Sequence, residues 1–330
     1  MLKEKILNAI EDVRNGKLFS EVKEYSPVEK RNEALFFFKP EVLKPRVDFG
    51  KILEITLDKF SEFGVSIESA CVFSGEYLKK YEIMAKHYGV INRIAREGKS
   101  AVSPAAKKKF REFFGEDIER APVLGAFQFL EKYPEFNEFS LYVLWENLEM
   151  KRLASGTSCE KIRIGENFMY VLNGFHPYQL LHFTAGDSLI VVMAVVSDSS
   201  WKGLRREMLG ATDPLHAEEG SLRRILLEKK KEFNLPEVSQ GYNGMHLSAG
   251  PVEALAELLR FCSNYETGKV LSIGDTAIGR KFLEAFSEEA VKEMLQNPKI
   301  KINGREESVF DLTEEMDVEE AIETLKKFYA

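Results

Sequence analysis

The sequence predicts an α+β fold in which helices cover an antiparallel sheet. Short apolar runs typical of buried strands alternate along the chain with segments whose apolar residues recur at helical spacing. The 330 residues are 44% hydrophobic and include 24 phenylalanines. Such a chain can bury a large core, in one enlarged domain or in two.

The N-terminal part predicts a central strand between helices. Ala34 to Phe38 form a continuous apolar run, as in a strand that is buried on both faces. Gly64 follows a segment of helical periodicity, and glycine is typical just past the end of a helix. The elements expected in this part are a helix at 3–14, a strand at 34–38, a helix at 49–63, a strand at 65–73 and a helix at 76–97.

The later part continues the alternation of strands and helices. Pro251 stands where a helix is expected to begin, and proline fits the first turn of a helix. This order of elements predicts a split β-α-β arrangement of the ferredoxin-like kind, with a four-stranded antiparallel sheet and covering helices. The elements expected here are a short helix at 178–183, a strand at 189–196, a helix at 201–209, a strand at 245–248 and a helix at 251–261.

Three segments lie outside this core, which spans 34–262. Residues 1–33 predict an N-terminal helical extension. Residues 89–172 interrupt the core, and helical patterns at 105–114 and 126–130 predict a mostly helical inserted subdomain. Residues 263–330 predict a C-terminal α/β extension, made of a helix at 279–295, a hairpin at 299–304 and a final helix from Val318.

Composition limits the classes of partner. A net charge of −7 and a pI near 5.6 argue against broad nucleic-acid binding. No run of 18 uncharged apolar residues occurs, and the N-terminus is charged, so we expect neither a membrane span nor a secretory signal, and a cytoplasmic protein. Cys71, Cys159 and Cys262 are odd in number and far apart, which favours reduced thiols over a disulfide framework or a zinc site.

One set of polar residues suits phosphoryl transfer. His246 lies in a short predicted strand, and a neutral imidazole nitrogen can attack a terminal phosphate. Arg206 and Arg223 offer planar donors that match phosphate oxygens, and Thr212 adds a hydroxyl. Lys39, at the end of the predicted central strand, supplies a further cation.

In order and spacing these residues resemble the nucleoside diphosphate kinase family, from about Ala34 to Cys262 with one long interruption. The resemblance implies a phosphotransferase that moves the terminal phosphoryl group of a nucleoside triphosphate through a phosphohistidine at His246 to an acceptor, most simply a nucleoside diphosphate. The other roles that it implies are contact with the transferring phosphate for Lys39, a grip on the nucleotide phosphates for Arg206, Thr212 and Arg223, a hydrogen bond to the sugar for Asn243, and orientation of His246 by Glu257 and Ser248.

The resemblance also implies the surroundings of the nucleotide. Tyr88 would lie near the phosphates, and Phe175 or Tyr178 would stack on the base. Mg²⁺ would arrive mainly with the nucleotide phosphates, because it keeps several waters and needs few protein ligands, so no separate metal site is predicted. The resemblance leaves open whether the protein forms a homo-oligomer.

The sequence departs from the family pattern near the histidine. Leu247 and Ala249 stand where the family has glycine and aspartate, and Glu41 follows Lys39-Pro40 where the family has aspartate. These departures favour a second hypothesis, a nucleotide-binding regulatory or repurposed module with little or altered activity. A third hypothesis is a purely structural interaction protein. It is the least favoured, because it does not explain why several cationic residues would converge on one site.

Overall fold

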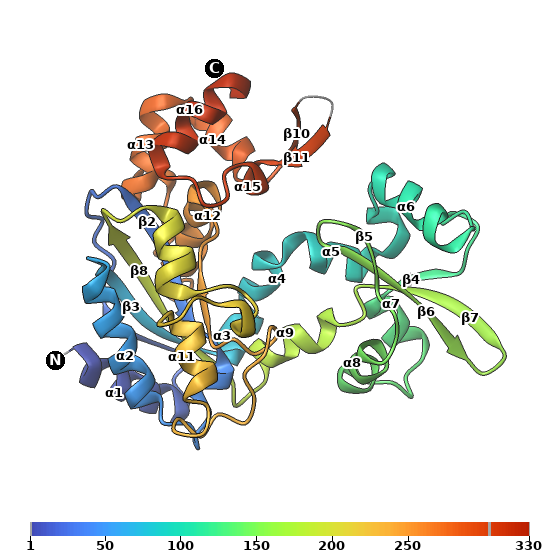
Figure 1. Ribbon diagram of the computed structural model, residues 1–330, viewed down its shortest axis with the longest axis horizontal. Helices are drawn as coiled ribbons and strands as arrows, with labels where there is room; N and C mark the ends of the chain where they lie inside the picture. Colours follow the sequence, from blue (N-terminus) through green and yellow to red (C-terminus); the bar gives the residue numbers. More distant parts are fainter. Residues whose placement is uncertain (1, 303–304, 330) are drawn as a thin grey trace. The chain divides into compact units, whose positions relative to one another are not determined.

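The computed structural model describes residues 2–302 and 305–329, which form two compact units (Figure 1). The first unit comprises Met1–Tyr77 and Gly186–Ala330, and the second comprises Leu78–Ala185. Both contain helices and antiparallel strands, so the predicted α+β class is confirmed. The second unit begins before the predicted insertion and ends after it, and the predicted C-terminal extension belongs to the first unit.

The first unit is built on a sheet of five strands in the order β1-β3-β8-β2-β9, in which every neighbouring pair is antiparallel. All side chains of the central strands β2 and β8 are buried. The sequence does not predict β1, because its half-exposed edge position leaves it without an apolar run, and the expected four-stranded sheet therefore has a fifth strand. The strands are β1 (Phe19–Lys23), β2 (Asn32–Phe38), β3 (Ser66–Ser74), β8 (Leu189–Ser197) and β9 (Met245–Leu247).

Helices cover both faces of this sheet. Phe36 of β2 packs edge-on against Phe60 of α2, whereas Phe37 points to the opposite face and stacks on Phe261 of α12. Figure 1 shows α11 beside α2. The helical elements are α1 (Leu2–Arg14), a 3₁₀ turn (Pro40–Leu43), α2 (Phe49–Glu62), α3 (Gly75–Lys80), α10 (Trp201–Gly203), a π-helical segment (Leu204–Leu209), a 3₁₀ turn (Pro214–His216), α11 (Leu222–Glu228) and α12 (Pro251–Phe261).

The C-terminal part of the first unit is mainly helical. The predicted helix at 279–295 is two helices, because Ser287 begins a new helix by accepting a hydrogen bond from Ala290 N–H. The predicted hairpin forms, and its turn at 303–304 lies outside the described residues. The elements are a 3₁₀ turn (Ile273–Asp275), α13 (Ala277–Ala285), α14 (Glu288–Met294), β10 (Lys299–Ile302), β11 (Arg305–Ser308), α15 (Val309–Leu312) and α16 (Val318–Tyr329).

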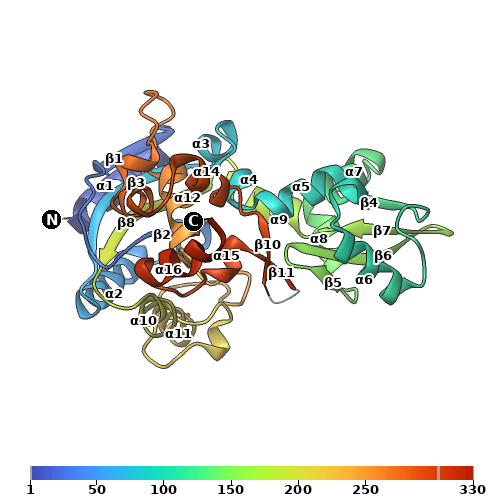
Figure 2. The ribbon, with the colours of Figure 1, turned by 90° about the horizontal axis from the view of Figure 1, so that it is seen from above.

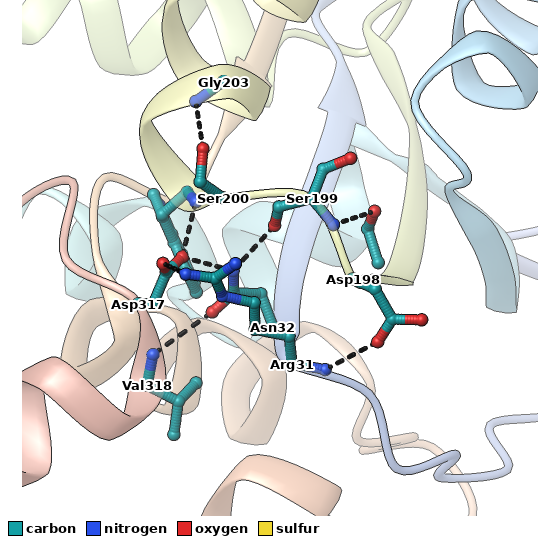
Figure 3. A network of polar contacts seen from close by, with 10 residues as sticks. Arg31, Asn32, Asp198, Ser199, Ser200, Gly203, Asp317 and Val318 are labelled. Atoms are coloured by element: carbon teal, nitrogen blue, oxygen red, sulfur yellow. Dashed lines mark hydrogen bonds and ion pairs between the residues drawn. The ribbon is translucent and has the colours of Figure 1, made fainter.

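Asp317 anchors the start of α16 to the sheet (Figure 3). One of its carboxylate oxygens accepts hydrogen bonds from the Asn32 side chain at 2.6 Å and from Trp201 N–H at 2.7 Å. The other oxygen pairs with Arg31, and Asn32 accepts in turn from Val318 N–H at 3.2 Å. The contacts join β2, the beginning of α10 and the C-terminal segment at one point.

The second unit contains many helices and also a sheet of its own, which the prediction of a mostly helical insertion did not include. Its four strands lie in the order β4-β7-β6-β5 (Figure 2). The cluster around Phe110 of α6 covers one face, and the cluster around Phe129 of α7 and Leu141 of α8 covers the other. The elements are α4 (Ile83–His87), α5 (Gly89–Glu97), a 3₁₀ turn (Gly98–Ala101), α6 (Pro104–Phe114), β4 (Val123–Gly125), α7 (Ala126–Lys132), α8 (Glu138–Glu146), β5 (Lys151–Ala154), β6 (Thr157–Ile164), β7 (Asn167–Leu172) and α9 (His176–Thr184).

The single helix predicted at 76–97 is three short helices, α3, α4 and α5. Glu82 adopts a left-handed backbone conformation, with φ of 55°, immediately before α4. Such a residue cannot continue an α-helix, and the helical spacing of the apolar residues does not reveal it.

None of the helices in the described parts of the chain is long and apolar enough to cross a membrane.

A buried carboxyl group in β6 makes the stability of the second unit depend on pH. Glu160 is 1% exposed, and neither of its carboxylate oxygens has a hydrogen-bond partner among the described residues. Burial, with the nearby Glu146 carboxylate, raises the pKa of Glu160 from 4.5 to about 8. The folded unit therefore holds a proton that the unfolded chain releases, and stability falls as pH rises from 4.5 through about 8.

We expect Glu160→Gln to raise the melting temperature at pH 8.5 by several degrees, a gain on the order of 1–3 kcal/mol from removing a buried unpaired charge. At pH 4.5 the gain should largely vanish. Thermal unfolding of the full chain at both pH values measures the difference. Glu166→Gln, an exposed neighbour in the turn after β6, is the matched control, and an equal gain in that variant would show that Glu160 is not responsible.

Candidate functional site

His246 lies on the edge strand β9, on the face of the sheet that α12 covers. It pairs with Phe37 across the β2–β9 ladder, and the two rings stack with centroids 4.5 Å apart. The side chain is 18% exposed, so a small part of the ring reaches solvent. The stacked phenyl ring limits the rotation of the imidazole and leaves its polar edge to the groups around it.

Glu257 and Ser248 hold the imidazole in place. His246 Nε2 lies 2.9 Å from Glu257 Oε1, and the Ser248 hydroxyl donates to Glu257 Oε2 at 2.6 Å. Ser248 is itself fixed, because its Oγ accepts from Leu35 N–H at 2.9 Å. A carboxylate facing Nε2 favours the tautomer with the proton on that nitrogen and the lone pair on Nδ1. The structure therefore brings these three predicted residues into contact.

Lys39 and Asn243 meet on the same face of the sheet. Lys39 lies two residues beyond Phe37, and its Nζ donates to Asn243 Oδ1 at 2.6 Å. The amide nitrogen of Asn243 donates to the carbonyls of Thr212 and Gln240 at 2.9 and 3.1 Å. Burial lowers the pKa of Lys39 to about 8, with Arg223 adding to the effect and Glu41 opposing it.

Arg223 is buried beside the histidine strand. Its Nη1 donates to the Gly210 carbonyl and its Nη2 to the Met245 carbonyl, both at 2.9 Å. Burial lowers the pKa of Arg223 to about 9, and the guanidinium of Arg205 contributes, while Glu41 opposes the change. A desolvated cation with a lowered pKa is stabilised by an incoming anion.

Arg206 does not join this group. It is exposed, and its Nε and Nη2 both contact Glu315 Oε2, at 2.8 and 2.6 Å. The preceding residue, Arg205, faces β9 instead and donates from Nη1 to the Leu247 carbonyl at 3.0 Å. The family resemblance selected Arg206 by its motif spacing, and in the structure the predicted helix at 201–209 is α10 followed by a π-helical segment at Leu204–Leu209.

Two further carboxylates that the sequence does not assign to the site lie next to it. Glu41 is buried and accepts from Gly244 N–H at 2.9 Å. Glu253 stands one helical turn before Glu257 on α12, and burial together with the Glu257 charge raises its pKa. The identity of Glu41 departs from the family pattern, but only the folded chain shows that its charge acts on both Lys39 and Arg223.

The remaining predicted residues lie elsewhere or contribute through the backbone. Thr212 is exposed, and its carbonyl is the atom that meets Asn243. Tyr88 and Phe175 belong to the second unit, where Tyr88 packs edge-on against His176 and Phe175 contacts Trp145.

The site thus combines an oriented imidazole with two cations whose pKa values burial lowers. Such a set can bind an anion and place a nucleophile beside it. No protein-family model matches the chain, and no curated protein matches it.

Proposed function

We propose that this chain is a phosphotransferase that moves the terminal phosphoryl group of a nucleoside triphosphate through a phosphohistidine at His246 to an acceptor, most simply a nucleoside diphosphate. The observation that carries the proposal is the hydrogen-bond network in which Glu257 contacts both His246 and Ser248. Lys39 and Arg223 lie at the same edge of the sheet.

The cations support an anionic substrate. Lys39 and Arg223 have lowered pKa values because the protein removes them from water. A bound phosphate group would therefore offset part of the desolvation free energy of these two cations. Both lie against the segment that carries His246, Lys39 through Asn243 and Arg223 through the Met245 carbonyl. Guanidinium and ammonium groups can stabilise the charge that spreads over a transferring phosphoryl group.

The chemistry divides into two balanced steps. Nδ1 of His246 attacks the terminal phosphorus, an N–P bond forms, and the bond from phosphorus to the bridging oxygen breaks, which releases the nucleoside diphosphate. In the second step a terminal oxygen of the acceptor attacks the same phosphorus, and the N–P bond breaks. The proton stays on Nε2 throughout, and Glu257 stabilises the positive charge on the phosphorylated ring.

Mg²⁺ enters this account with the nucleotide. Mg²⁺ keeps several waters and needs few protein ligands, so it would be held mainly by the phosphate oxygens, with buried Glu257 as the carboxylate that contacts His246. When bound, Mg²⁺ neutralises charge on the phosphates.

The order of the strands supports the same family resemblance. Strands β3-β8-β2-β9, without the added β1, lie in the sequence expected of a ferredoxin-like split β-α-β sheet. Helix α2 connects β2 to β3, and α11 precedes β9, which are the two crossovers of that arrangement.

One observation favours a second candidate function. Arg206, which the family resemblance assigns to the phosphates, is paired with Glu315. A nucleotide-binding regulatory module with little turnover is therefore the alternative.

The experiment that tests the proposal exposes the purified protein to Mg²⁺ and a terminally labelled nucleoside triphosphate. We expect acid-labile, base-stable label on the protein, because phosphoramidates behave in this way. Binding of the nucleotide without label would favour the regulatory module, and absence of binding would overturn both functions.

The lowered pKa of Lys39 gives the proposal a pH signature. Lys39 is cationic below about pH 8 and loses its charge above it, so affinity for a nucleoside diphosphate should fall several-fold between pH 7 and pH 9. Calorimetric titrations across this range measure the fall. Lys39→Met should bind about 10-fold more weakly at pH 7 and show a flatter profile. A parent and variant with the same profile would show that Lys39 does not meet the phosphates.

A further inference from the structure

The position of two neighbouring arginines suggests which of them serves the site. Arg205 and Arg206 are adjacent in the π-helical segment Leu204–Leu209. The wide turn is closed by a bond from Gly210 N–H to the Arg205 carbonyl at 3.1 Å, five residues apart. A π-turn shifts the residues along a helix surface relative to α-helical spacing, and such turns are frequent at functional sites.

Arg205 and Arg223 lie on either side of His246 along the outer edge of β9. Arg223 donates to the carbonyl of Met245, and Arg205 donates to the carbonyl of Leu247. Each guanidinium thereby occupies part of the edge where a further strand would otherwise pair. The two arginines are close enough that the charge of Arg205 helps to lower the pKa of Arg223.

Each of the two guanidinium groups has one polar atom that is not satisfied by the residues that the structure describes. The Nε atoms of Arg205 and Arg223 are buried and have no hydrogen-bond partner within the described part of the chain. The Arg205 Nη2 lies 3.5 Å from Glu314 Oε1, which is a loose contact compared with the 2.6 Å pair of Arg206 and Glu315. Arg223 is buried and the Arg205 side chain is 17% exposed, and two neighbouring like charges of this kind favour the binding of a polyanion, although the Glu253 carboxylate also lies within reach of the Arg205 charge.

Arg206 contacts a different part of the protein, the segment before α16. Its two contacts with Glu315 attach the π-helical segment to the chain that precedes α16. Glu315 N–H also donates to the Ala249 carbonyl at 2.9 Å, and Asp317 accepts from Trp201 N–H at the start of α10. Arg206 thus belongs to the attachment of the C-terminal segment.

We infer that Arg205, together with Arg223, is the arginine that contacts the phosphate groups of the nucleotide, and that Arg206 secures the C-terminal segment. This inference rests on the proposed function. It assigns the phosphate grip to an arginine one position before the one that family spacing selects.

The test compares four variants, Arg205→Ala, Arg205→Lys, Arg206→Ala and Lys202→Ala, by calorimetric titration of the full chain with ADP and Mg²⁺. Arg205→Ala should weaken ADP binding by about 10- to 100-fold, as expected for loss of a charge-assisted contact. Arg205→Lys should recover part of the loss, because lysine donates as a single point charge. Lys202→Ala removes an exposed charge from the same stretch of helix and should leave affinity within about twofold.

Melting temperatures and adenosine binding separate a phosphate contact from loss of structure. A phosphate role predicts that Arg205→Ala binds adenosine as the parent does, whereas a disturbed sheet edge would weaken adenosine and ADP alike and contradict the inference. A larger ADP loss in Arg206→Ala than in Arg205→Ala would overturn it as well. A parent that binds no ADP and takes no label from a triphosphate would instead remove the proposed function on which the inference rests.

Discussion

Replacement of His246 by alanine should abolish phosphoenzyme formation and lower nucleotide exchange by at least about 1,000-fold, the order of loss seen when a catalytic nucleophile is removed. In the proposed mechanism the imidazole supplies the nucleophile, while Lys39 and Arg223 hold the phosphates, so nucleotide affinity should change little. The ring is partly exposed at a sheet edge, but its loss removes both its stacking on Phe37 and one hydrogen bond to the buried Glu257, so the melting temperature of the variant is measured beside its activity.

A second histidine provides the control. His216 is in the same unit, and its side chain is 80% exposed. His216→Ala should label and turn over as the parent does. If His246→Ala still took label from a nucleoside triphosphate, the covalent route through this residue would be wrong.

Replacement of Arg223 by alanine should damage both stability and binding. The guanidinium is 4% exposed and satisfies the carbonyls of Gly210 and Met245, and its charge balances that of Glu41. Its removal leaves buried acceptors and a buried carboxylate without compensation, so we expect a loss on the order of 3–5 kcal/mol in the free energy of unfolding. Denaturant unfolding measures this loss, and affinity for ADP should fall with it.

The next residue along α11 is the matched control. Arg224 is paired with Glu228 at 2.6 Å on the solvent side. Arg224→Ala should lose less than about 1 kcal/mol, as exposed ion pairs do. Equal losses in the two variants would contradict the structural role given to Arg223. Arg223→Lys separates the two effects, because it keeps the charge and loses the second carbonyl contact.

The strands and helices of the first unit could be predicted from apolar patterns because burial is strong there. Strand β2 reads as an apolar run because both of its faces are covered. Strand β1 is half-exposed at an edge, and its mixture of polar and apolar residues resembles a loop. In the second unit, β6 alternates buried and exposed residues with charged side chains between them, so it gives no continuous run.

In the candidate site, too, some contacts could be predicted from the sequence and others could not. His246, Ser248 and Glu257 lie close together in the chain, so a strand followed by a helix brings them into contact. The contact of Arg205 with the Leu247 carbonyl could not be predicted from the sequence, because the motif spacing pointed to Arg206 and the π-helical turn was not expected. Glu41 acts through buried charge, which a sequence pattern does not measure.

The most direct measurement of the central claim starts from protein labelled by a terminally labelled nucleoside triphosphate and freed of nucleotide. An unlabelled nucleoside diphosphate with Mg²⁺ is then added, and the products are followed within one turnover. The account predicts that the label leaves His246 and appears as the terminal phosphate of the new triphosphate. Label that stays on the protein, or that leaves only as inorganic phosphate, would contradict it.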